Sequence, residues 1–109
     1  MKPARLMKVI RRWLAEQDVE QAISHYLTQS PRAALGLVDA LESGFEQIRR
    51  HPEAGSPRYA HELDLPGVRS LPLGRYPYVV FYVVGADAID VWRVLHAHRD
   101  IPELFRDGD

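Results

Sequence analysis

The spacing of apolar residues predicts two helices in the first half of the chain. Between residues 14 and 27 the apolar positions follow the period of one helix face, at Leu14, Ala15, Val19, Ala22, Ile23, Tyr26 and Leu27. Glu16, Asp18 and Glu20 fall in the first turns, where the helix dipole favours acids. A second apolar stripe follows at Ala34, Leu37, Val38, Leu41, Phe45 and Ile48.

The residues at either end of the second apolar stripe predict where the second helix begins and ends. Ser30 suits an N-cap, and Pro31 suits the first helical position. Pro52 stops the helix because proline lacks the backbone N–H that the helix needs. Since a loop of about three residues joins the two helices, we expect them to pack antiparallel.

In the last third of the chain the pattern becomes that of strands. Residues 78–84 are apolar at every position, which predicts a central strand covered on both faces. Residues 89–95 include Asp90 and Arg93, so this strand is expected to be half covered. A short break containing Gly85 separates the two runs and indicates a hairpin.

Two weaker strands complete the predicted fold. Residues 68–73 form one, with Pro72 restricted to an edge or an end, and residues 6–10 form the first strand at a basic sheet edge. The order β-α-α-β-β-β predicts an α+β fold, with a helical hairpin packed on one face of a curved, mostly antiparallel four-stranded sheet. Residues 51–67, which include three prolines, are expected to form a loop.

The length of 109 residues predicts a single domain over 1–109, with a core at 5–100 and a short tail at 101–109. One last helical turn is expected at 102–106. The chain has no cysteine, which excludes disulfides, a thiol nucleophile and cysteine zinc sites. Neither a membrane span nor a secretory signal is expected from the apolar runs, so the predicted location is the cytoplasm. No cofactor is expected.

Charge argues against general nucleic-acid binding, because the formal net charge is −1. Polar groups nevertheless gather at the margins of the strands: Arg69, Arg75, His96, His98, Arg99 and Asp100. A structural interpretation pairs Arg69 and Arg75 with acids such as Asp90 or Glu62, and gives His96 a hydrogen-bonded structural role. No metal site is expected, since no third ligand stands near the two histidines.

Other candidates are weaker. Trp92 is interpreted as a core residue or part of a partner-binding surface rather than as a platform for stacking bases. His25, His51 and His61 stand apart in the sequence and are expected to be solvated.

Several motifs occur in the order and spacing of a known family. They are AEQDV at residues 15–19, HPEAG at 51–55, PGVR at 66–69, YPYVVFY at 76–82 and RVLHAHRD at 93–100. With these motifs the chain resembles the ParE/RelE toxin superfamily of type II toxin–antitoxin systems, and is closest to the ParE branch. The resemblance extends over roughly residues 8–100.

The resemblance implies a cytoplasmic toxin that a cognate, ParD-like antitoxin neutralises. ParE-like members inhibit DNA gyrase, whereas RelE-like members are ribosome-dependent mRNA endoribonucleases. On the ribonuclease alternative, Arg69, Arg75, His96 and His98 are the candidate catalytic groups. The chain has no lysine after Lys8 and no tyrosine after Tyr82, which favours gyrase inhibition without catalysis.

The resemblance also implies two binding surfaces. One contacts the target or partner and is expected to contain Arg69, Arg75, Trp92, His96, His98 and Arg99. The arginine after Pro-Gly-Val can instead orient the neighbouring loop. The other surface is a groove for the antitoxin, with Leu14, Tyr26 and Val38 as its expected lining. Direct sequence-specific nucleic-acid binding by the toxin alone is not expected, nor is a membrane partner.

Overall fold

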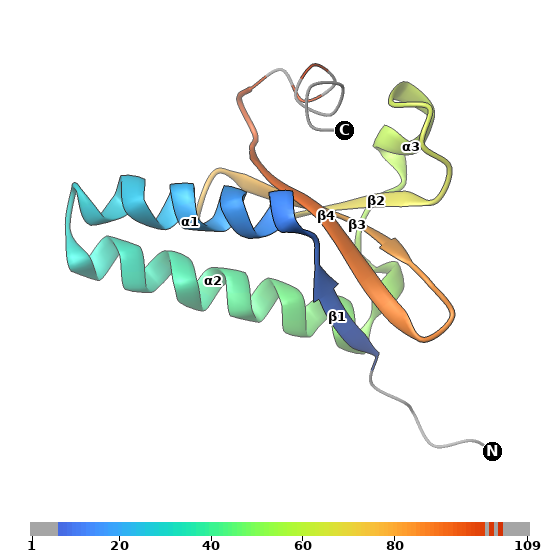
Figure 1. Cartoon of the computed structure of the whole chain (residues 1–109), viewed down its shortest axis with the longest axis horizontal. Helices are drawn as coiled ribbons and strands as arrows, with labels where there is room; N and C mark the ends of the chain where they lie inside the picture. Colours follow the sequence, from blue (N-terminus) through green and yellow to red (C-terminus); the bar gives the residue numbers. More distant parts are fainter. Residues whose placement is uncertain (1–6, 100, 102, 104–109) are drawn as a thin grey trace.

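The computed structural model describes residues 7–99, 101 and 103, and it is an α+β fold as predicted (Figure 1). Its elements are β1 (Lys8–Arg11), α1 (Trp13–Leu27), α2 (Pro31–Arg50), the short 3-10 helix η1 (Pro52–Ala54), α3 (Arg58–Glu62), β2 (Val68–Pro72), β3 (Tyr78–Val84) and β4 (Ala88–His96). The strands form one sheet in the order β1-β4-β3-β2. β1 runs parallel to β4 and the other pairs are antiparallel, which confirms the mostly antiparallel sheet.

The two long helices begin and end where the sequence predicts. The Ser30 hydroxyl accepts a hydrogen bond from the backbone N–H of Ala33 at 3.0 Å, and α2 starts at Pro31. In Figure 1, α1 and α2 lie side by side as an antiparallel hairpin. No helix in the described part of the chain is long and apolar enough to cross a membrane.

The sheet is covered on both faces, so the molecule has two apolar cores. The face toward α1 and α2, here called the helix face, carries Val80, Tyr82, Ile89, Val91 and Val94, which pack against Ala15, Val19, Ala22, Leu37, Leu41 and Ile48. The opposite outer face carries Val68, Val79, Phe81 and Leu95, which pack with Tyr59, Leu65 and Ile101. Since side chains alternate along a strand, β3 feeds both cores. This confirms the prediction drawn from its continuous apolar run.

The loop predicted at residues 51–67 is wrong in part, because it contains η1 and α3. α3 has only five residues, too few to show a helical period in the sequence. It is held by Tyr59, whose ring packs edge to face on Phe81 with centroids 5.3 Å apart. α3 therefore covers the outer face of the sheet.

Other boundaries differ by a residue or two. β1 ends at Arg11 rather than at residue 10, and Leu6 lies outside the described residues. β2 ends at Pro72 and is an edge strand, as the proline requires. Asp100 and most of the helical turn expected at 102–106 lie outside the described residues.

Candidate functional site

Among the described residues, no strand pairs with the second half of β4 on the side away from β3. β1 pairs with β4 only as far as Arg11 opposite Val91, after which the chain turns into α1. Opposite β3, the pairs Phe81–Arg93 and Tyr82–Val91 leave Trp92 as an extra residue, so the strand contains a bulge there. From this point β4 runs along α1 instead of along β1.

Asp18 of α1 occupies this open edge. Its Oδ2 accepts a hydrogen bond from the backbone N–H of Val94 at 3.0 Å. The same carboxylate accepts from Arg93, at 2.8 Å from Nε and 2.9 Å from Nη2. The Asp18 and Arg93 side chains are only 11% and 12% exposed. The carboxylate thus replaces the missing strand and neutralises a half-buried guanidinium.

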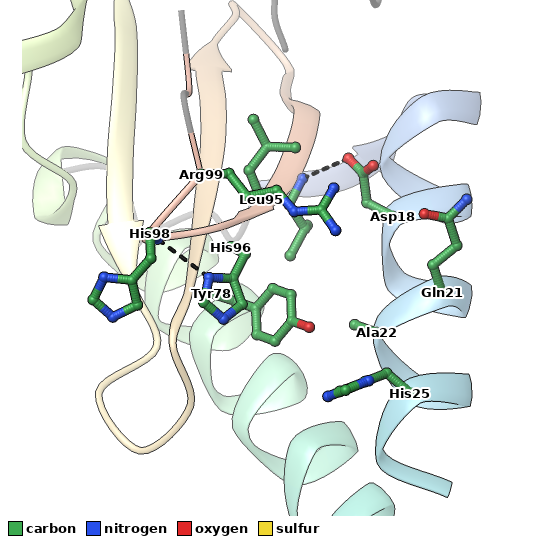
Figure 2. Close-up of a pocket in the computed structure, with 10 residues that line it drawn as sticks. Asp18, Gln21, Ala22, His25, Tyr78, Leu95, His96, His98 and Arg99 are labelled. Atoms are coloured by element: carbon green, nitrogen blue, oxygen red, sulfur yellow. Dashed lines mark hydrogen bonds between the residues drawn. The ribbon is translucent and has the colours of Figure 1, made fainter. Parts of the chain in front are cut away.

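A pocket of about 440 Å³ lies between α1 and the end of β4. Figure 2 shows α1 side chains on one side, with Tyr78 of β3 and the segment from Leu95 to Arg99 on the other. The pocket is lined by Asp18, Gln21, Ala22, His25, Tyr78, Val94, Leu95, His96, His98 and Arg99. Three of the predicted partner-binding residues, His96, His98 and Arg99, therefore lie together.

His96 is held by contacts on two sides. Its Nδ1 accepts a hydrogen bond from the backbone N–H of His98 at 3.2 Å, which places the proton of the neutral ring on Nε2. Its ring packs edge to face on Tyr78 at 5.3 Å, and the His98 ring lies 5.4 Å away. The predicted hydrogen-bonded role of His96 is confirmed by these contacts.

The surroundings of His96 disfavour its charged form. Burial lowers the pKa of His96 below its usual value, and the positive charges of His98, Arg99 and His25 lower it further. His96 therefore favours its neutral form more than a fully solvated imidazole does.

His25 is exposed, as expected, but it is not isolated. It lies on α1 and lines the same pocket as His96. Its Nε2 is 3.2 Å from Nε2 of Gln29. The signal was present in the sequence, because residues 18, 21, 22 and 25 recur at the spacing of one helix face.

Trp92 contacts Asp90 and Arg12 and does not line the pocket. Its Nε1 donates to Oδ2 of Asp90 at 3.0 Å, and the Arg12 guanidinium lies 4.5 Å from its ring centroid. Arg12 and Asp90 also form an ion pair at 2.8 Å. Asp90 is thus the partner of Arg12, and the expectation that it pairs with Arg69 or Arg75 is wrong.

Arg69 orients the segment that follows α2. Its Nη1 donates to the carbonyl oxygens of Gly55 at 2.7 Å and Glu53 at 3.3 Å, so it pairs with backbone groups rather than with Glu62. It lines a second pocket, together with Arg50 and Val84. The alternative role of Arg69, as an organiser of the loop, is confirmed.

Arg75 lies in the turn between β2 and β3 and lines a third pocket, against α2. Arg69 lies opposite Tyr82 and His96 opposite Tyr78, so about 13 Å of strand separates their positions along the sheet. The structure therefore does not bring the four candidate catalytic groups together.

The residues predicted to line an antitoxin groove are all half-buried. The Tyr26 ring packs edge to face on Tyr76 and Tyr78, with centroids 5.2 and 6.4 Å apart, at the margin of the core. For all three residues, a place in such a groove stays a prediction. Among the described residues, the large apolar side chains that are exposed were not predicted to line the groove: they are Ile10, Trp13, Leu27, Leu35 and Val84.

Among the described residues, no group of three or more His, Asp or Glu side chains is placed to hold a metal ion. The chemistry available at the end of β4 is instead that of hydrogen-bond donors and positive charge, from imidazoles and one guanidinium.

Comparison with known proteins shows a family and a similarity to solved structures. Residues 9–101 match the family model described as the ParE toxin of type II toxin-antitoxin system, parDE. A chain from the solved structure "Chromosomal ParDE TA system from P. aeruginosa" is similar in fold, with a TM-score of 0.72 and 24% sequence identity. The similarity covers 85% of this chain and 98% of that chain. A search of curated proteins gave no match.

Proposed function

The chain belongs to the ParE toxin family of type II toxin–antitoxin systems, and on that premise we propose that it inhibits DNA gyrase by binding to it. In this proposal the toxin traps gyrase on cleaved DNA and blocks replication. The observation that carries the proposal is the family match over residues 9–101. The protein acts in the cytoplasm, where gyrase and DNA meet.

The end of β4 is the surface that we assign to the target. His96, His98 and Arg99 line one pocket there, and Trp92 lies on the same strand. We assign Arg69 the role of holding the loop after α2. We assign Arg75 a second contact with the target, at the β2–β3 turn. The cognate antitoxin, which we take to be ParD-like, neutralises the toxin by covering part of its surface.

The dispersal of the arginines supports binding over catalysis. Cleavage of RNA needs a base, an acid and groups that stabilise phosphate charge, all around one phosphate. Arg69, Arg75 and His96 line three different pockets, and the Arg69 guanidinium is engaged with backbone carbonyls. The net charge of −1 also supports a toxin that does not bind nucleic acid directly.

A cleavage assay with purified gyrase tests this proposal. We expect the toxin to increase double-strand breaks in supercoiled DNA only when gyrase is present. Arg99→Gln is expected to reduce the breaks, because it removes a charge from the assigned surface. Arg32→Gln, an exposed arginine of α2 outside that pocket, serves as the matched control. DNA that stays intact at every toxin concentration contradicts the proposal.

One observation favours the alternative of a ribosome-dependent endoribonuclease. His25, His96, His98 and Arg99 do converge on one pocket, and imidazoles are common acids and bases in catalysis. This alternative predicts cleavage of mRNA during translation and intact chromosomal DNA.

A further inference from the structure

The pocket at the end of β4 gathers basic groups from two parts of the chain. His25 comes from α1, while His96, His98 and Arg99 come from the end of β4 and the turn after it. In Figure 2 the Arg99 side chain extends toward α1. No hydrogen bond or ion pair joins the Arg99 guanidinium to another described residue.

The single carboxylate in the lining is already satisfied. Asp18 accepts two hydrogen bonds from Arg93 and one from the backbone of Val94. Its negative charge is therefore balanced by Arg93, which does not line the pocket. The remaining polar groups are three imidazoles, one guanidinium, the Gln21 amide and the Tyr78 hydroxyl, and every one of them can donate a hydrogen bond.

An anion in this hollow meets hydrogen-bond donors from both α1 and the end of β4, and the charge of Arg99 attracts it. An arginine beside imidazoles is well suited to an oxyanion, since the guanidinium can donate two parallel hydrogen bonds to it. Ala22, Val94 and Leu95 also line the pocket, and these apolar groups suit the methylene groups of a side chain.

We propose that this pocket binds the carboxylate of an aspartate or glutamate side chain presented by a protein partner. The inference rests on the proposed function, because both treat the end of β4 as a protein-binding surface. It adds the chemistry of the contact: an acidic side chain that enters between α1 and Arg99.

A protein carboxylate fits this surface better than the backbone of a nucleic acid. A duplex presents a continuous line of phosphates and needs an extended positive surface. α1, which lines one side of the pocket, instead carries the exposed acids Glu16 and Glu20. An acidic side chain on a peptide reaches the basic pocket without placing a row of charges along that helix.

The test uses N-acetylglutamate as the probe and the imidazole resonances of the full chain as the readout, at constant pH. We expect the probe to shift the resonances of His25, His96 and His98. His51 and His61, which are exposed and outside the pocket, serve as internal controls and should not move. N-acetylglutamine, which has the same shape without the charge, should shift none of them.

Two variants separate the pocket from nonspecific attraction. Arg99→Gln is expected to weaken binding of N-acetylglutamate about tenfold, because it removes a charge-assisted hydrogen bond. Arg32→Gln should leave the affinity unchanged. Since both positions are exposed, an unchanged backbone spectrum verifies that each variant is folded. His98→Gln is a second pocket variant with the same expectation as Arg99→Gln.

Several results overturn the inference. They are equal shifts at His51 and His61, equal binding of N-acetylglutamine, and no shift of the pocket histidines with N-acetylglutamate. Inorganic phosphate, titrated in parallel, overturns it if it binds tenfold more tightly than the carboxylate, since the site is then one for phosphate. Because gyrase is absent from this experiment, a failure here is distinct from a failure in the DNA cleavage assay.

Discussion

At the scale of single residues, Tyr82 connects the sheet to the segment after α2. Its hydroxyl donates to the carbonyl oxygen of Pro52 at 2.7 Å and accepts from the N–H of Gly55 at 2.8 Å. A Cβ atom on Gly55 would lie 2.6 Å from that hydroxyl oxygen, so only glycine allows this approach. Arg69 donates to the carbonyl oxygen of the same glycine, and together these contacts fix the HPEAG segment.

Tyr82→Phe is therefore expected to destabilise the protein by about 1–3 kcal/mol, because two backbone groups lose their buried partner. Tyr59→Phe is the matched control: its ring packs on Phe81, but no described residue accepts a hydrogen bond from its hydroxyl. It should cost less than about 0.5 kcal/mol. Urea unfolding of both variants measures the difference, and equal stabilities would show that the Tyr82 hydroxyl does not hold the segment.

The role of Arg69 could be predicted from the sequence only as one of several alternatives. Its place after Pro-Gly-Val gave the loop-orienting role, but the pairing with Asp90 or Glu62 was equally open. The partners are backbone carbonyls of Glu53 and Gly55, and every residue has a carbonyl. Nothing in the residue types could therefore have selected this pair.

At the scale of elements, α1 completes the sheet where β1 ends. Asp18 supplies the acceptor that a neighbouring strand would have supplied to Val94, and holds Arg93 with the same carboxylate. The sequence placed Asp18 in the first turns of a helix and explained it by the helix dipole. Its contact with residues 93 and 94 is nonlocal, and no periodicity reports such a pairing.

Asp18→Asn is expected to lower the free energy of unfolding by about 2–4 kcal/mol, since it breaks the largely buried ion pair with Arg93. The amide oxygen can still accept from Val94, so the loss reports mainly the ion pair. Glu20→Gln, an exposed acid on the same helix, should change stability by less than about 0.5 kcal/mol. Chemical denaturation compares the two, and an equal effect would mean that Asp18 is only a surface charge.

Elements with a long or regular pattern were predictable, and short ones were not. α1, α2 and β3 follow from apolar periodicity, and the start of α2 follows from Ser30 and Pro31. α3 was missed because its five residues are held by contacts of Tyr59 with a distant strand. Its stability comes from packing on the outer face rather than from local sequence.

In the whole molecule, the polar residues at the margins of the sheet lie in separate pockets. The sequence put Arg69, Arg75 and His96 at the margins of adjacent strands, which permitted a shared active site. The fold instead places them at three pockets. Arg69 lies about 13 Å along the sheet from His96, and Arg75, in the turn between β2 and β3, lines a pocket against α2. Of the predicted residues, only His96, His98 and Arg99 lie together, and His25 of α1 lines the same pocket.

The central claim is that this toxin acts by binding gyrase rather than by cutting RNA. Inducing the chain alone in cells and comparing the integrity of chromosomal DNA with that of translated mRNA tests it most directly. We predict double-strand breaks in DNA, with mRNA intact at the time when growth stops, and rescue by the cognate antitoxin. Cleaved mRNA with intact DNA would contradict the account and establish the ribonuclease alternative.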